Sequence, residues 1–401
     1  MCFTSMPKTD KQATNNVLQV ADFSLSFHHS VSDIADELPP QYDTFLEVEF
    51  LSSLEQKPPL GYDFCYVLIK KQEKVIGFFP FQIKHFKASE SLNFNPRQSA
   101  ISLFLKRKLA QIVEFKTLIV GSLLLTGEHS FYFEQGILIE EKEKLIHASI
   151  GFAIENLGKK GVNIQSIFVK DFYAEQNYLN IEGYNQFQVE PHFIFTSQPS
   201  WTKFEDYLEA LFSKYRVRAK RAFKKISGLE LKEFNEERII ANQLKINELY
   251  QNIRTKSSFN LVDLNEEHFL QLKQNMGDAF HLFGYFKEEK LIGFFTLIET
   301  HTALEAHYLG YDESENAEHQ LYLNMLFEMV RFGVDNQFKI INFGRTAHEI
   351  KSSVGAEGHE MYLYMKHKNY FINKSLPYLL KFLSPREAWV ARQPFKLGEE
   401  A

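Results

Sequence analysis

A seven-residue repeat is the feature of this sequence that most constrains its fold. Residues 73–79 read Glu-Lys-Val-Ile-Gly-Phe-Phe, and residues 289–295 read Glu-Lys-Leu-Ile-Gly-Phe-Phe. Each copy follows an aromatic and aliphatic run and a short polar turn, which is typical of a β-hairpin. The same elements are then predicted in both copies: a strand, a helix and a strand at 116–125, 141–159 and 163–170, and again at 304–310, 317–335 and 339–343. We therefore predict a duplicated α/β domain.

Length and composition agree with two domains. The chain has 401 residues, enough for two domains with cores of their own. We expect a flexible tail at 1–20, a first domain at 21–199, a second at 200–375, and a C-terminal amphipathic helix and tail at 376–401. In that helix Leu376, Tyr378, Leu379 and Phe382 form the apolar face, which either caps the second domain or rests on a membrane surface.

Charge, cysteines and hydropathy exclude several classes of protein. A net charge of -6 argues against a DNA-binding field over the whole protein, and two cysteines are too few for a disulfide framework or a structural zinc site. The N-terminus has no apolar signal-peptide core, and the most apolar stretch, 117–125, is too short to span a bilayer. We expect a cytoplasmic protein without a transmembrane segment or a bound metal.

A basic amphipathic helix is predicted between the copies, from a capping box at Thr202 and Glu205 to Gly228. One face carries Tyr215, Ala219, Ala222 and Ile226. The opposite face carries four cations at spacings of four, three and four residues: Lys214, Arg218, Arg221 and Lys225. This face is either a clamp for an anionic partner (tRNA, a carrier-protein helix or a lipid headgroup) or a solvated surface.

The order of hairpin, strand, helix and strand resembles the GNAT (general N-acetyltransferase) superfamily, and the duplication resembles its tandem branch, which includes the Fem-type aminoacyltransferases. The sharper likeness lies in the second copy. There 341–356 (INFGRTAHEIKSSVGA) and 361–366 (MYLYMK) look like the pattern of a strand ending in Phe-Gly-Arg, a Lys ahead of Gly-Ala, and a further strand. The resemblance implies two tandem domains, each a mixed central sheet flanked by helices.

The superfamily resemblance also implies acyl-CoA as the donor, held by a glycine-rich loop at the start of the central helix. Here the corresponding segment, 312–318 (DESENAE), has no glycine and carries four carboxylates, which would repel a pyrophosphate. An acyl carrier protein or an aminoacyl-tRNA therefore stays open as the donor. Asn316 and Tyr322, in the Asn-and-Tyr segment that leads into this helix in the family, are the predicted cofactor contacts, and Asn316 or Ser314 is expected to cap the helix.

Arg345 and Lys351 are the first candidates for the active site, because cations just beyond a central strand lie where α/β sheets bind ligands. The alternative for Arg345 is a structural ion pair with Glu349 or Glu357. Ser352 and Ser353 follow on the same loop as candidate cofactor contacts, or as ordinary turn residues.

His307 and Tyr308, on the predicted strand at 304–310, are candidate proton carriers. Only one of two neighbouring strand residues is expected to face the cleft, and a structural histidine is the alternative. Superfamily likeness places the reacting carbonyl where the two central strands part, near 307–310 and 342–345.

These expectations combine into one function with two alternatives. The first is an N-acyltransferase that moves an acyl group from acyl-CoA or acyl carrier protein to an amine on a small molecule or a lipid or envelope precursor. Its second copy carries the cleft, and its first copy is degenerate or contributes to the acceptor side. The alternatives are a Fem-like aminoacyl-tRNA-dependent transferase acting on a cell-envelope precursor, with peripheral membrane contact, and a non-catalytic GNAT-fold binding protein.

Overall fold

The structure, a computed structural model, describes residues 17–39, 43–87, 114–173, 183–256, 261–383 and 389–395. Most of the predicted N-terminal tail, and the side chains of Leu379 and Phe382, lie outside this part. The first copy consists of β1 (Val17–Val20), β2 (Phe23–His28), α1 (Val48–Gln56), β3 (Tyr62–Lys71), β4 (Lys74–Lys87), β5 (Glu114–Val120), β6 (Tyr132–Phe133), α4 (Ile139–Lys159), β7 (Ser166–Tyr173) and β8 (Asn185–Thr196).

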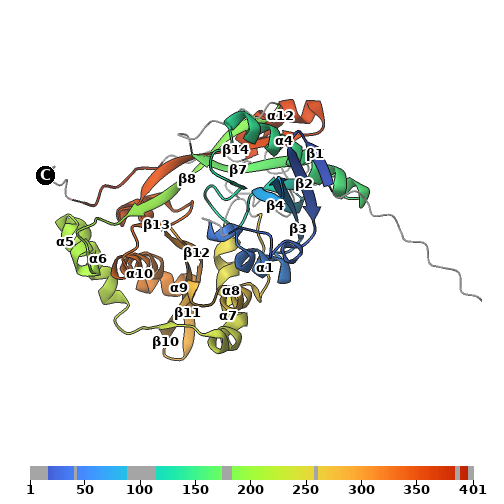
Figure 1. The fold of residues 1–401 in the computed structure, drawn as a ribbon. Coiled ribbons are helices and arrows are strands. Elements are labelled where there is room, and N and C mark those ends of the chain that lie inside the picture. The colour runs from blue at the N-terminus through green and yellow to red at the C-terminus, as the bar shows by residue number, and fades with distance from the viewer. Residues whose placement is uncertain are drawn as a thin grey trace, which may run out of the picture.

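The second copy begins with two helices and later repeats the order of hairpin, strand, helix and two strands found in the first (Figure 1). Its elements are α5 (Phe204–Ala210), α6 (Ser213–Lys225), β9 (Glu230–Glu233), α7 (Glu236–Arg254), α8 (His268–Met276), β10 (Phe280–Lys287), β11 (Lys290–Glu299), β12 (Leu304–Tyr311), α9 (Glu313–His319), α10 (Leu321–Asp335), β13 (Ile340–Asn342), α11 (His348–Ser353), β14 (Glu357–His367) and α12 (Tyr370–Leu383).

The predicted duplication is confirmed by the strand pairing. In the first copy the hairpin β3–β4 pairs with β5, which runs parallel to β7 after the helix α4. In the second copy the hairpin β10–β11 pairs with β12, which runs parallel to β13 after α10. The polar turn of the first hairpin holds Gln72 and Glu73 at φ 49° and 67°, the left-handed conformation of a tight two-residue turn.

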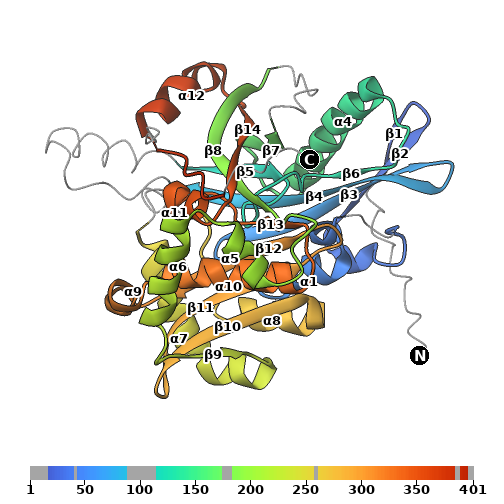
Figure 2. The same cartoon turned by 90° about the vertical axis from the view of Figure 1, so that its left-hand side faces the viewer.

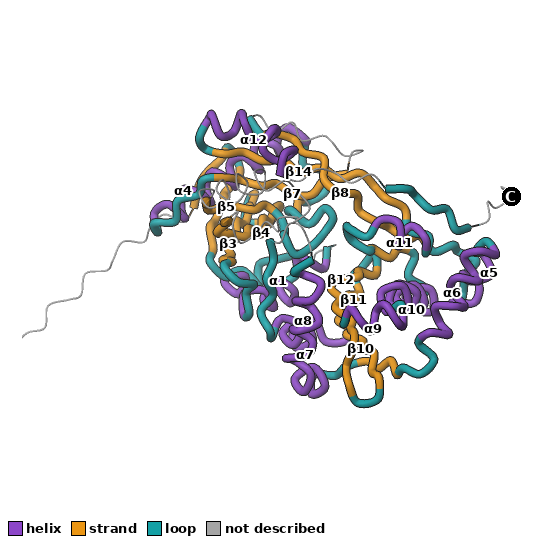
Figure 3. Tube along the Cα trace, turned by 180° about the vertical axis from the view of Figure 1, so that it is seen from behind, coloured by secondary structure: helices purple, strands orange, loops and turns teal. Residues whose placement is uncertain are grey.

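The two copies share one 14-stranded sheet, because their last strands are exchanged at the junction. β14 of the second copy lies between β7 and β8 of the first, and β8 pairs in turn with β13. Figures 1 and 3 show β7, β14 and β8 side by side where the two halves meet, and Figure 1 also labels β13. The domain bounds of the sequence analysis stay a prediction, and the hydrogen-bonded sheet runs across the junction without a break.

Three hydrophobic cores follow from this arrangement. α4 closes a core on one face of the first copy, and α5, α6 and α10 close one on the second copy (Figure 2). The third core is common to both copies, because α1 contacts α8 and the apolar faces of β3 and β10 contribute to the same cluster. The predicted stripe of α10 is buried as expected, with Met325 and Val330 both 0% exposed.

Three predicted elements end differently in the structure. The helix predicted from Thr202 to Gly228 is two helices, since the chain is extended at Leu211 between α5 and α6, and Thr202 donates to Asp206 rather than pairing with Glu205. The helix predicted at 317–335 is divided by the left-handed Gln320. The strand predicted at 116–125 stops at Val120, because Gly121 has φ 100° and turns the chain.

α12 packs on β8 and β14 through Leu376, which is 3% exposed. Tyr378, predicted on the apolar face, is 79% exposed. Among the helices of the described residues, none combines the length and the apolar character that crossing a bilayer requires.

Candidate active site

The central strands of the second copy part at a defined residue pair. β12 and β13 pair in parallel only through Leu304 with Ile341 and Glu305 with Asn342. β13 ends at Asn342, whereas β12 continues to Tyr311. Beyond Asn342 the chain bonds to β8 instead, through the Phe343 N–H and the Phe193 carbonyl. The divergence therefore begins just beyond the Glu305–Asn342 pair, next to the positions near 307–310 and 342–345 where the superfamily resemblance predicts the reacting carbonyl.

Glu305 is the titratable group at this point. Its carboxylate accepts a hydrogen bond from the Asn342 side-chain amide across the last paired position. Burial raises the pKa of Glu305 from 4.5 to about 7, and this effect exceeds the opposing ones of His129 and Asn342. A carboxyl group with a pKa near neutrality changes its protonation state easily at physiological pH, which suits a general base.

Arg345 reaches across the junction to the first copy. Its guanidinium Nη2 lies 2.6 Å from Asp171 Oδ2 near the end of β7, where the Asp171 side chain is 1% exposed. Lys170 Nζ lies 3.5 Å from the same carboxylate. Arg345 thus pairs with Asp171 and, within the described residues, not with Glu349 or Glu357, the partners predicted for a structural ion pair; Glu349 pairs with Arg392 instead. The pair of Arg345 with this buried carboxylate joins the two copies.

Two further polar pairs of the first copy lie beside this carboxylate. His129 Nδ1 is 2.8 Å from Asp43 Oδ2, and the Tyr173 hydroxyl is 2.7 Å from His192 Nδ1. Burial disfavours the charged form of His129, but Asp43 and other nearby carboxylates outweigh it and raise its pKa. Burial lowers the pKa of His192 to about 3, so this ring is neutral. We call the following residues the seam cluster: Asp43, His129, Asp171, Tyr173, His192, Glu305, Asn342 and Arg345.

The seam cluster holds several buried polar atoms without a hydrogen-bond partner among the described residues. Most buried polar atoms in folded proteins are paired, so a concentration of unpaired ones marks a place where water or a ligand completes the bonding. The atoms are Asp171 Oδ1, His192 Nε2, Asn342 Oδ1 and Arg345 Nε. Both copies contribute to this set, which makes the site a composite of the two.

Lys351 holds the loop that carries Arg345. Its ammonium donates to the Phe343 carbonyl at 2.6 Å and to the Arg345 carbonyl. Burial lowers the pKa of Lys351 to about 7. The loop is strained, because Thr346 and Ala347 have φ values of 67° and 51°. Left-handed backbone at a β-branched residue persists only where the surroundings enforce it, and such strain concentrates at functional sites.

His307 and Tyr308 both lie against α8, although neighbouring residues of a regular strand point to opposite faces. The register of β12 with β11 shifts between Phe295 and Leu297, so an extra residue enters the strand and the alternation is interrupted. The ring of His307 lies 5.7 Å and that of Tyr308 6.2 Å from the ring of His268, measured between centroids. Burial keeps the pKa of His307 well below its usual value, so the ring is neutral.

The predicted cofactor contacts Asn316 and Tyr322 meet at the start of α10. The Asn316 side-chain oxygen accepts from the Tyr322 N–H at 2.9 Å, and thereby takes the place of a cap for α10. Asp312 caps the preceding helix α9 by accepting from Ser314 N at 3.0 Å. In the described part of the chain, neither Asn316 nor Tyr322 forms a hydrogen bond with a residue of the seam cluster.

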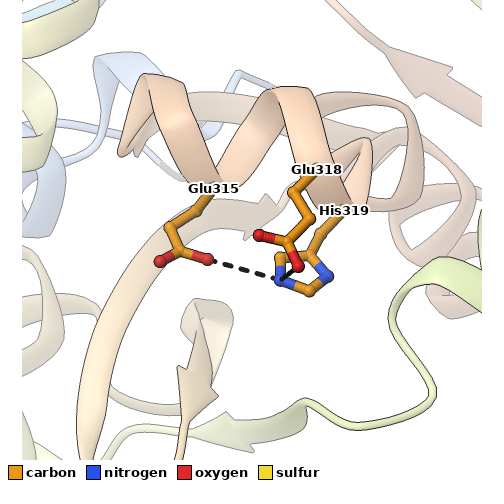
Figure 4. A group of neighbouring side chains, drawn as sticks. All are labelled: Glu315, Glu318 and His319. Carbon is orange, nitrogen blue, oxygen red and sulfur yellow. Dashed lines mark ion pairs between the residues drawn. The ribbon is translucent and has the colours of Figure 1, made fainter.

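The acidic segment before α10 is compensated by neighbouring cations. Figure 4 shows Glu315 and Glu318 directed toward the ring of His319, with which Glu315 forms an ion pair of 3.3 Å. Lys287 Nζ lies 3.0 Å from Glu315 and 3.7 Å from Glu318. His319 Nδ1 donates to the Lys225 carbonyl at the end of α6. Glu315, Glu318 and His319 lie close enough together to hold a metal ion, but the Lys287 ammonium already lies beside the two carboxylates.

The remaining predicted residues lie outside the seam cluster. The Ser352 and Ser353 hydroxyls are buried and donate to carbonyls of α11, from Glu349 and Ile350 respectively. On α6, Ala219 and Ala222 are buried as predicted. The four predicted cations of that helix are exposed: Lys214, Arg218, Arg221 and Lys225.

Sequence reasoning missed the residues that the first copy contributes, above all Asp171 and His129. It also missed Glu305, although a single carboxylate at the start of an apolar strand (Leu-Glu-Ala-His-Tyr-Leu) was a usable signal. Asp171 offered a similar one, because it follows a lysine at the end of a buried strand. No pattern in the sequence indicates that Asp171 and Arg345 form a pair, since β7 and β13 are not neighbours in the sheet.

Neither the family models nor the curated protein sequences compared with this chain match it. The crystal structure of FemX does, over 89% of this chain and 100% of its own, with a TM-score of 0.52 and 10% identity. Lower scores belong to a tandem GNAT protein from the clavulanic acid biosynthesis pathway (TM-score 0.48, 10% identity, 86% of this chain and 99% of that one) and L-PGS from Bacillus licheniformis (0.45, 12%, 84% and 96%). The likeness to FemX shows that the chain has the predicted tandem fold of the Fem-like type, and at such identity it concerns the fold alone.

Proposed function

We propose that this protein is an N-acyltransferase that moves an acyl group from the thioester of acyl-CoA or acyl carrier protein to an amine. The observation that carries the proposal is Glu305. A carboxyl group with a pKa of about 7 stands where the central strands of a GNAT-type sheet diverge, beside buried polar atoms that await a partner.

In the proposed reaction the amine nitrogen attacks the thioester carbonyl carbon while the Glu305 carboxylate takes the proton that the amine loses. The C–S bond then breaks, and the leaving thiolate takes the proton from Glu305, so the carboxylate is restored. The Arg345 guanidinium, fixed by Asp171, supplies positive charge for an anionic group of a substrate. The protein needs no covalent intermediate for this sequence of steps.

The test is transfer itself. Purified protein is incubated with acyl-CoA, acyl carrier protein and aminoacyl-tRNA in separate reactions with a pool of amines, and the products are followed by mass spectrometry. Glu305→Gln should lower kcat by about 10²–10⁴-fold, because the proton acceptor is removed. Glu299→Gln, on the neighbouring strand, should retain activity, since Glu299 pairs with His281 away from the seam cluster.

The outcomes separate the candidates. Full activity in Glu305→Gln would sink the assignment of the base. Transfer from aminoacyl-tRNA alone would favour a Fem-like transferase on an envelope precursor, for which the exposed cations of α6 are the supporting observation. If the wild-type protein uses none of the donors, the non-catalytic binding protein becomes the better description.

A further inference from the structure

A surface cavity of about 430 Å³ lies between α6 and α11, away from the seam cluster. It is lined by Lys214, Tyr215, Arg218, Glu349, Ile350 and Arg392. Figure 2 shows α6 and α11 as neighbours on this side of the molecule. The two α6 cations are one helical turn apart, so both side chains project from the same face toward the cavity.

The charge of this cavity is unbalanced. Arg392 pairs with Glu349 at 2.9 Å, the single carboxylate of the lining. Lys214 and Arg218 form no ion pair with any carboxylate of the described ranges, and both are exposed. Three cations therefore face one carboxylate, a net of two positive charges in a concave site, which is the complement of a phosphate group.

The walls of the cavity are fixed to one another. The Arg392 N–H donates to the Ser352 hydroxyl of α11 at 3.1 Å. The Phe212 N–H, just before α6, donates to the Pro394 carbonyl at 2.7 Å, and Leu211 forms a β-bridge with Phe395. The segment that carries Arg392 thus ties α6 to α11, so the backbone from which the cations project is fixed before any ligand binds.

We propose that this cavity binds the phosphate of a phosphopantetheine-bearing donor, with Lys214 and Arg218 as the phosphate contacts and Tyr215 and Ile350 as apolar walls. The site would supply from α6 the positive charge that the segment 312–318 lacks. The choice of this ligand rests on the proposed function, whereas the phosphate chemistry follows from the cations alone. Coenzyme A and a carrier protein share the phosphopantetheine group, so the test has an arm for each.

The test is binding measured by calorimetry at low ionic strength, with inorganic pyrophosphate, coenzyme A, and carrier protein with and without its phosphopantetheine arm. The double variant Lys214→Gln/Arg218→Gln should weaken binding of pyrophosphate and of the preferred donor by at least about tenfold, because two charge-assisted contacts are lost. The matched control, Lys220→Gln/Arg221→Gln, removes the same charge from the same helix outside the cavity lining and should bind as the wild type does. Lys214→Arg/Arg218→Lys, which keeps the charge, should retain most of the affinity if the variants are folded by circular dichroism.

Equal losses in both double variants would overturn the proposal, as would a wild-type protein that binds none of the probes. A short RNA that binds more tightly than every probe, and that both double variants weaken equally, would overturn it in favour of an RNA-binding face. The result is separable from the proposed function. If the donor binds but no acyl group is transferred, the phosphate site is supported and the proposed reaction is wrong. If acyl transfer occurs and the Lys214/Arg218 variant has an unchanged donor KM, the reaction is supported and the phosphate site is wrong.

Discussion

The two copies of the domain differ at one matched position of their parallel strand pairs. The repeat aligns Ile298 of β11 with Gln82 of β4. Ile298 lies opposite Glu305, which pairs with Asn342 of the parallel strand. Gln82 lies opposite Ile119, which pairs with Phe168 of the parallel strand. The preceding position is the same in both, with Leu304 and Ile341 matching Leu118 and Ile167. A polar pair in the second copy thus stands where the first has an apolar one.

The backbone follows this difference. In the first copy the parallel pairing of β5 with β7 continues beyond Ile119, because Val120 pairs with Val169. These two strands therefore stay paired at this position. In the second copy the parallel pairing stops at the polar pair, and the strands part. The first copy therefore keeps its parallel strands paired and contributes Asp171 and Tyr173 near the end of β7. The second copy has parting strands and contributes Glu305 and Arg345.

The largest effect is expected when the carboxylate of the second copy is placed at the matched apolar position of the first copy. Ile119→Glu places a carboxyl group at a position that is 0% exposed and whose parallel partner is Phe168. The amide of the facing Gln82 already donates to Ser122, so burial must shift the pKa of the new carboxyl by several units, which corresponds to about 5 kcal/mol of unfolding free energy. Urea denaturation followed by circular dichroism measures it. A variant as stable as the wild type would show that the matched positions are interchangeable.

The next effect concerns the ion pair between the copies. Asp171→Ala leaves the Arg345 guanidinium without its carboxylate at the junction and should lower the unfolding free energy by about 3 kcal/mol. Glu349→Ala breaks the exposed pair with Arg392 and should have no measurable effect. If the two variants unfold at the same denaturant concentration, Asp171 does not join the copies.

A smaller effect compares two buried lysines that each hold a loop. Lys351 donates to carbonyls at 343 and 345, and Lys170 donates to those of Ser122 and Leu125. Each Lys→Met variant loses charge-assisted hydrogen bonds and should cost about 2 kcal/mol, measured by thermal unfolding. Lys351→Met should also lower transfer activity, because it releases the loop of Arg345. Unchanged activity would mean that this loop does not act on the substrate.

The last effect is the pH dependence of stability that Glu305 causes. Its pKa is raised from 4.5 to about 7, so the folded protein binds more protons than the unfolded chain between these values. Stability contributed by the neutral carboxyl is complete below pH 4.5 and declines as the pH rises to about 7. Glu305→Gln should remove this decline, seen as the difference between the two pH profiles of unfolding. In the transfer assay the wild-type rate should rise through the same pH range, since the base must be ionised.

Much of the fold was predictable, because the evidence for it is local. The repeat, the hairpins and the stripe of α10 depend on residues close in sequence, and all three are present in the structure. The two long predicted helices failed, because they break at Leu211 and Gln320. Their apolar spacing continues across each break, and only packing against neighbouring elements shows where the chain must turn.

The sequence by itself determined the duplication, the tandem GNAT fold and the cations of α6. The tertiary structure alone decided which of its charged groups meet: Asp171 with Arg345, Asp43 with His129, and the α6 cations with the segment around Arg392. The physical reason for the first of these pairs is the exchange of β8 and β14, which brings the end of β7 and the loop after β13 into one buried seam. Buried charges need partners, and the partners are set by the topology of the sheet rather than by any pattern along the chain.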